Sequence, residues 1–174
     1  MKKWSLLLTI IVGSACLFQA CKKEDDDEEF TIEGQAFVTQ AASSNNLDIM
    51  AGNLAAERGV LQLVKDFGTD IVSQQTGANT ELEALATSEG LSYSSTLIPV
   101  HEHNFGILSP LTGEIFDQRF AELMVLTHQE AVTLFEAAAQ SDDDPELRQY
   151  AASKLPGLRA NLQTAASFQA QVNQ

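Results

Sequence analysis

The spacing of apolar residues constrains the fold of this chain more than any other feature. From Gln35 to the C-terminus they recur every three or four positions, with almost no strand-like alternation. This period is that of an amphipathic helix, which must bury its apolar stripe against another element. Hydrophobic residues make up 44% of the 174 residues, enough for one domain with a real core. We therefore expect an all-α domain.

Four stretches carry the helical pattern, at about 35–58, 60–89, 113–140 and from 145 onward. The expected core positions are Phe37, Ala41, Ala42, Ile49, Met50, Leu54 and Ala55; Val60, Val64, Phe67, Ile71, Ala78, Leu82 and Leu85; Phe116, Phe120, Leu123, Met124, Leu134 and Phe135; and Leu147, Ala151, Leu155, Leu158, Leu162 and Ala165. The same spacing places Gln74 or Gln75 on the buried stripe of the second helix, and His128 on that of the third.

Several residues mark the ends and irregularities of these helices. Gly90 is expected to end the second helix as a left-handed cap. Asp144 is expected to cap the fourth, with Pro145 at its first position. Pro156 lies inside the fourth helix and is expected to kink it, because proline removes a backbone hydrogen bond. Gly68 lies inside the second and weakens it unless packing uses the glycine.

A long connection, Leu91 to Thr112, separates the second and third helices. Two helical hairpins joined by such a connection describe a ferritin-like four-helix bundle over residues 34–174. The alternative is an up-down bundle whose middle loop runs over the surface. Connections beyond about 15 residues often carry function.

The N-terminus has the parts of an export signal. Residues 1–20 hold two lysines, a short apolar run and small residues, the pattern of a signal peptide. Ala20-Cys21 resembles the lipobox of bacterial lipoproteins, whose cysteine carries the lipid. Cys16, which follows Ala15, is the competing acceptor. The apolar run is too short to span a membrane as a helix.

The segment after Cys21 is strongly acidic. Six consecutive acids, 24–29, repel one another, and we expect residues 21–33 to form a solvated tether. A charged run after the cysteine resembles lipoproteins of the Bacteroidetes group. The resemblance implies an outer-membrane lipoprotein and an export signal to the outer face of that membrane. An ordinary secreted protein with a fortuitous cysteine is the alternative. The net charge of −14 excludes a nucleic-acid binder, since phosphate contacts need Lys and Arg.

A family resemblance rests on a series of short motifs in order. They are Phe37-Val38 with Ala41-Ala42, Leu54-Ala55, Ala78-Asn79 followed by Leu82, Phe116-Asp117, His128-Gln129-Glu130 and Leu155-Pro156. Over about residues 36–166 the chain resembles the "domain of unknown function 4142" family of exported bacterial proteins. The resemblance implies a ferritin-like bundle and an envelope location, and no established activity.

Departures from the family matter for the expected site. The resemblance implies an Asp-His pair where this chain has Gln74-Gln75, a His where it has Asn161, and a Glu where it has Asp48. His128 matches. Amides bind transition metals poorly beside imidazole and carboxylate. We therefore expect an inward polar network of Asp48, Gln74 or Gln75, His128 and Asn161 that satisfies its own hydrogen bonds.

Metal binding remains an alternative. A diiron bundle uses Glu-x-x-His pairs, and no histidine here has a Glu three residues before it. His101 and His103 lie in the long connection, and in an extended segment both side chains would point to one side. Asp48 and His128 are the candidate ligands at the bundle centre.

No motif for nucleophilic catalysis or phosphate binding is present. We expect a lipid-anchored bundle with a binding or envelope-maintenance role, no cofactor and no catalytic residues. The alternatives are a metal-binding or redox protein, and a scaffold that associates with itself. The sequence does not identify a protein or small-molecule partner.

Overall fold

The computed structural model describes residues 33–141 and 144–174. Over these ranges the chain is all-α, as predicted, with the five helices α1 (Gly34–Arg58), α2 (Gln62–Ser88), α3 (Pro99–Leu108), α4 (Gly113–Gln140) and α5 (Pro145–Val172). Cys16, Cys21, the predicted signal peptide at 1–20 and all but the last residue of the predicted tether at 21–33 lie outside the described residues. No helix within the described ranges combines the length and apolarity needed to cross a membrane.

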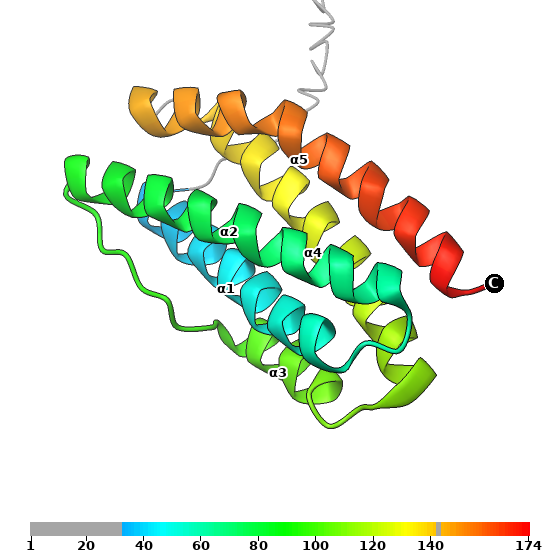
Figure 1. Ribbon diagram of the computed structural model, residues 1–174. Coiled ribbons are helices and arrows are strands. Elements are labelled where there is room, and N and C mark those ends of the chain that lie inside the picture. Colours follow the sequence, from blue (N-terminus) through cyan, green and yellow to red (C-terminus); the bar gives the residue numbers. More distant parts are fainter. Residues whose placement is uncertain (1–32, 142–143) are drawn as a thin grey trace, which may run out of the picture.

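The four long helices form two antiparallel hairpins, α1 with α2 and α4 with α5 (Figure 1). The hairpins are joined mainly by contacts between α1 and α4, whereas α2 and α5 touch over only a few residues. The short helix α3 packs across α1 and α4. One side of the bundle is therefore covered by α3, and the opposite side has the looser seam between α2 and α5.

The prediction of four helices was one short, because the long connection contains α3. The connection also runs the length of the bundle. Its start is tied to the first turn of α1, where the Gln35 amide exchanges two hydrogen bonds of 2.9 Å with the backbone of Ser92. Its end is tied to the last turn of α1, where Arg58 donates to the Ser109 carbonyl at 2.8 Å. The chain thereby returns to the opposite end of the bundle, and α4 runs in the same direction as α2.

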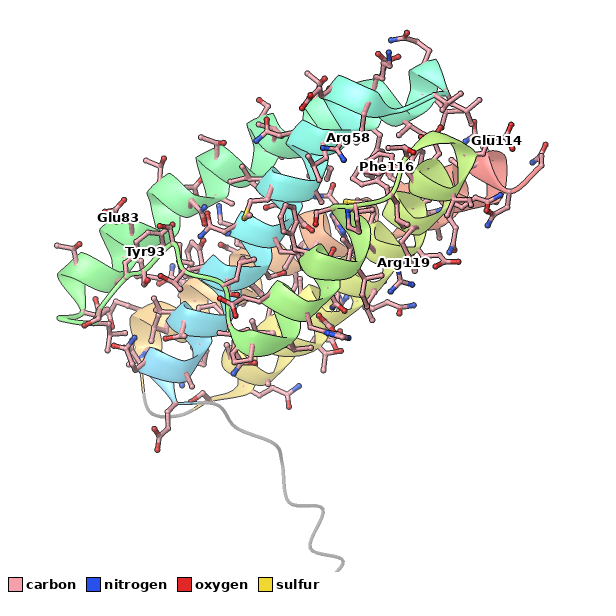
Figure 2. The ribbon with its side chains drawn as sticks, turned by 90° about the horizontal axis from the view of Figure 1, so that it is seen from below. Arg58, Glu83, Tyr93, Glu114, Phe116 and Arg119 are labelled. Carbon is pink, nitrogen blue, oxygen red and sulfur yellow. The ribbon has the colours of Figure 1, made fainter. Side chains whose placement is uncertain are left out.

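Aromatic residues mark both ends of this return path. Figure 2 shows Arg58 beside Phe116 at one end and Tyr93 beside Glu83 at the other. The Arg58 guanidinium lies 5.8 Å from the centre of the Phe116 ring, a cation–π contact. Partial burial raises the pKa of Tyr93, opposed by a hydrogen bond with Asn46 and aided by the Glu83 carboxylate. The Tyr93 contacts place the start of the connection against α1 and α2, whereas the Arg58–Phe116 contact joins the end of α1 to the start of α4.

The core divides into two apolar clusters. One includes Leu47, Val64, Met124 and Phe168, and the other includes Phe37, Leu82, Phe135 and Leu147. Along α1, α2 and α4, buried polar residues lie where one cluster gives way to the other. We call them the central polar layer: Ser43, Asp48, Gln75, Thr127 and His128, with His101 from α3. The bundle is thus apolar toward both ends and polar in the middle.

Most predicted core positions are buried, with two clear exceptions. Val60 lies in the turn before α2 and is 55% exposed, and Met50 is 38% exposed. Ser43 and Ser44, which have low helix propensity, lie in the uninterrupted middle of α1 and are buried. Tertiary burial therefore outweighs their low helix propensity.

The predicted caps of α2 and α5 are confirmed. Gly90 follows α2 with a φ of 68°, a left-handed conformation that glycine adopts at no steric cost. Asp144 accepts hydrogen bonds from the backbone N–H groups of Glu146 and Leu147 at 3.0 and 2.9 Å. Pro156 lies inside α5, which runs unbroken through it as one helix.

The beginning of α2 is capped from another helix. Asp117 of α4 is 1% exposed and accepts hydrogen bonds from the backbone N–H groups of Val60 and Leu61, at distances of 2.9 to 3.1 Å. No side chain of the N-cap residue Leu61 performs this role. Asp117 therefore joins the turn between α1 and α2 to the first turns of α4.

Candidate functional site

Asp48 is the centre of the polar layer. Its side chain is 2% exposed, and its two oxygens accept hydrogen bonds from two different helices. The Thr127 hydroxyl of α4 donates to Oδ1 at 2.8 Å, and the Gln75 amide of α2 donates to Oδ2 at 3.1 Å. A buried carboxylate is thereby held by neutral donors, which satisfy its hydrogen bonds without neutralising its charge.

Burial controls the ionisation of Asp48. It raises the pKa of the Asp48 carboxyl above its ordinary value of 3.8, because a low-dielectric interior disfavours the charged form. The nearby His128 opposes this shift most strongly, followed by the hydrogen bonds from Thr127 and Gln75 and then by His101. The Asp48 carboxyl therefore keeps its proton to a higher pH than an exposed aspartate does.

His128 has one nitrogen in use and one free. Its Nδ1 lies 2.7 Å from the Met124 carbonyl, which only accepts hydrogen bonds, so Nδ1 must carry the proton. Its Nε2 is buried and has no hydrogen-bond partner among residues 33–141 and 144–174. In a neutral ring protonated at Nδ1, the Nε2 atom carries a free lone pair. A backbone carbonyl holding the Nδ1 proton is also the arrangement that orients many metal-binding histidines.

His101 forms a second polar cluster of the layer. Its Nδ1 lies 2.6 Å from the Ser43 hydroxyl, and its Nε2 lies 3.6 Å from a carboxylate oxygen of Glu130. The Ser43 hydroxyl also accepts a hydrogen bond of 2.8 Å from the backbone N–H of Ile98. Ser43 and His101 therefore fix the start of α3 on α1. Because Ser43 is fully buried and already bonded to two groups, it has no access to a substrate.

The interpretation of 101–103 as an extended segment was wrong. Both histidines belong to α3, and residues two positions apart on a helix point to nearly opposite sides. His101 is buried against α1, whereas His103 is exposed. The structure does not bring their imidazoles together.

The predicted inward network is divided in two. Asp48, Gln75 and His128 share the central polar layer. Gln74 and Asn161 are instead bonded to each other, amide to amide at 3.1 Å, between α2 and α5 near the surface. One helical position separates Gln74 from Gln75, and that rotation of 100° directs only Gln75 to the core.

Within the described ranges, one group of three potential metal ligands lies close together: Glu89, Asp144 and Glu146. Asp144 caps α5 there, so the cluster has a structural role. Asp48, His101 and His128 do not form such a group within the described residues.

A family model for a "Domain of unknown function (DUF4142)" matches residues 19–168. The chain belongs to the DUF4142 family. This confirms the family predicted from the short motifs. Among curated proteins, no sequence matches the chain.

Two solved structures share the fold of this DUF4142 chain. CopM in the Cu(II)-bound form has a TM-score of 0.64 and 15% sequence identity, covering 79% of this chain and 95% of CopM. A DUF305 fragment from Deinococcus radiodurans has a TM-score of 0.64 and 24% identity, covering 81% of this chain and 99% of the fragment. At these identities the likeness concerns the fold alone.

The contacts in and beside the central polar layer of this DUF4142 chain involve three residues that were not predicted as site residues from the sequence. Ser43, Thr127 and Glu130 have no local signal, because each pairs with a residue at least 29 positions away. A signal for His101 was present. Pro99 with Glu102 in the following turn is a helix start, and it places His101 on a helix.

Proposed function

We propose that this chain is a lipid-anchored protein of the cell envelope, attached to the outer membrane through Cys21. Its bundle has a binding or envelope-maintenance role and is not an enzyme. The support for the anchor is the order of signal peptide, cysteine and acidic run in residues 1–33. A diacylated cysteine with a third acyl chain holds a protein on a membrane firmly, whereas one chain does not.

One observation carries the non-catalytic part of the proposal. The donors that hold Asp48 are a hydroxyl and an amide, and both are neutral. A ferritin-like oxidase centre needs several carboxylates and imidazoles that converge on one point. Thr127 and Gln75 instead satisfy the carboxylate by themselves, which suits a structural layer.

Replacing the cysteine tests the anchor. In cells given labelled palmitate, Cys21→Ala is expected to lose the label and to leave the membrane fraction. Cys16→Ala is the matched control and keeps both. Label that persists in Cys21→Ala and disappears in Cys16→Ala would identify Cys16 as the acceptor and overturn the assignment.

A second candidate function is transition-metal binding at the bundle centre. It is favoured by the unpartnered Nε2 of His128 beside the Asp48 carboxyl, and by the fold shared with a protein named in a copper(II)-bound form. Imidazole nitrogen is a good ligand for copper and zinc. The residues fit incompletely, because structural metal sites use four protein ligands and the described residues offer two here.

Metal analysis separates the two candidates. If the layer is structural, protein dialysed against copper(II) or zinc retains less than one ion per chain, and His128→Gln changes nothing. Stoichiometric retention that His128→Gln abolishes would favour the metal-binding function. His103→Gln is the control for binding at an exposed imidazole, since His103 is a surface residue.

A further inference from the structure

A groove of about 350 Å³ lies along the seam between α2 and α5. Its walls come from residues 73–81 of α2 and 150–161 of α5, and its floor includes Asn45, Gln75 and Phe135. The two helices neighbour each other in Figure 1 but make few contacts. The groove is near the lower end of the size range for small-molecule sites.

Two polar bridges cross the groove and link its two walls. Lys154 forms an ion pair with Glu81, and Asn161 donates a hydrogen bond to Gln74. On each helix the two bridging residues are seven positions apart, a rise of about 10 Å. The helices run antiparallel, so the bridges match in register.

Glycines between the bridges produce the open space. Gly77 of α2 and Gly157 of α5 both line the groove. A Cβ added at either position would meet no atom within 4 Å. Glycine inside a helix costs roughly 1 kcal/mol relative to alanine. Helix packing does not require these two glycines, and their effect is to leave the groove unfilled.

The groove offers hydrogen-bonding atoms that the protein itself does not use. Within the described residues, the side-chain carbonyl oxygens of Asn45, Gln75 and Asn161 accept no hydrogen bond, because each amide is engaged only through its nitrogen. In the same part of the chain, the Gln74 amide nitrogen donates to no acceptor either. Burial and the Glu81 carboxylate raise the pKa of Tyr150 to about 12, which keeps its hydroxyl a donor. The site therefore presents both donors and acceptors.

Charge and shape exclude several classes of ligand. Lys154 and Glu81 neutralise each other, and the net charge of −14 repels anions such as phosphates. A flat aromatic ligand would find no free platform, because Lys154 lies over the Tyr150 ring at 5.3 Å and Phe135 is nearly buried. An apolar ligand would leave the amides unpaired, which costs binding energy. A neutral molecule with several hydroxyl groups matches the site.

We propose that the groove between α2 and α5 binds one or two units of a neutral saccharide. Sugar hydroxyls both donate and accept, as the amides of Asn45, Gln74, Gln75 and Asn161 do. The inference goes beyond the proposed function and does not depend on lipidation of Cys21 or on a metal at His128. Its failure would leave both of those assignments unchanged.

Nuclear magnetic resonance detects such binding directly. The probes are maltose, cellobiose and N,N′-diacetylchitobiose, each titrated into the isotope-labelled domain, with glycerol as the control. At least one sugar is expected to shift the side-chain amide signals of the four groove residues in a saturable manner. The absence of saturable shifts with all three sugars, or shifts that glycerol reproduces, would overturn the proposal.

Variants at two open glycines locate the site. Gly157→Gln fills the groove and is expected to weaken sugar binding at least tenfold. Gly106→Gln, on the exposed part of α3, is the matched control, because a Cβ there also meets nothing within 4 Å. Because the Cβ of either new side chain has open space around it, both variants are expected to fold. Unchanged binding by Gly157→Gln, or an equal loss in Gly106→Gln, would contradict the assignment.

Discussion

Asp117 shows how much a single buried carboxylate connects in this fold. It belongs to α4, yet its oxygens bind the backbone just before α2. Neither the turn nor α2 supplies this acceptor itself. Replacing the residue therefore affects two elements that are more than 50 positions apart in the sequence.

We expect Asp117→Asn to lower the free energy of unfolding by about 1–3 kcal/mol, because an amide has one acceptor oxygen and leaves one of the two N–H groups without an acceptor. Urea-induced unfolding measures the change. Asp70→Asn on the exposed side of α2 is the control and is expected to cost almost nothing. Equal losses in the two variants would mean that the cap contributes nothing.

The raised pKa of the Asp48 carboxyl leads us to expect that the stability of the fold depends on pH. Its carboxyl pKa is raised on folding, so the folded chain holds the proton more tightly than the unfolded chain does. Its favourable contribution is complete below about pH 4 and is lost as the pH rises through the folded-state pKa. Asp48→Asn lacks this titration. We expect its unfolding free energy relative to wild type to increase between about pH 4 and pH 7, measured by urea unfolding at each pH. A constant difference would show that the carboxyl pKa is not raised.

At the residue scale, the sequence identified which polar residues matter but not how they pair. Periodicity placed His128 on a buried stripe, the family resemblance pointed to Asp48, and both are buried. It left Gln74 and Gln75 as alternatives, and only side-chain contacts with α1 separate them. The Gln74–Asn161 bond joins two helices whose spacing depends on the whole bundle, so no local pattern predicts it.

At the scale of the elements, α1 and α2 approach closely where two glycines face each other. A Cβ built on Gly68 would lie 2.7 Å from the Gly52 carbonyl oxygen, and a Cβ on Gly52 would lie 2.8 Å from that of Gly68. Backbone atoms cannot move away as a flexible side chain does. Packing therefore uses Gly68, whereas Gly77 two and a half turns later meets nothing.

These two glycines in one helix make a matched pair. Gly68→Ala is expected to destabilise the protein by about 1–3 kcal/mol through overpacking. Gly77→Ala is expected to stabilise it by about 0.5–1 kcal/mol, since alanine is the better helix former. Thermal unfolding followed by circular dichroism measures both. Changes of the same sign would contradict the close contact of α1 with α2.

The long helices and their caps were predictable because their signals are local. Gly90 and the Asp144-Pro145 pair act within one turn of the helices that they end or begin. Helix α3 was missed because a ten-residue helix shows little periodicity, and its position depends on Ser43 of a distant helix. Short elements in long connections are fixed by tertiary contacts more than by their own residues.

At the scale of the whole molecule, two apolar clusters share the same four long helices. Leu47 belongs to one cluster and Leu82 to the other, and neither is exposed. Because α1 and α2 run unbroken through both, the clusters are expected to unfold together. The central polar layer lies between them without interrupting any helix.

Leu47→Ala and Leu82→Ala are each expected to lower the unfolding free energy by about 2–5 kcal/mol, since each leaves a cavity. Both variants are expected to keep one unfolding transition with an unchanged dependence on urea. Leu126→Ala, at a position that is 39% exposed, is the control with a smaller loss. A second transition in either core variant would show that the two halves unfold separately.

The central polar layer also restricts how the helices align along their axes. Sliding one hairpin past the other by a single turn, about 5.4 Å, would move the Asp48 carboxylate away from Thr127 and toward apolar side chains. An uncompensated charge there costs several kcal/mol, whereas aliphatic side chains accept many shifted arrangements. The central polar layer thus disfavours shifted alignments of the two hairpins that an entirely apolar core would allow.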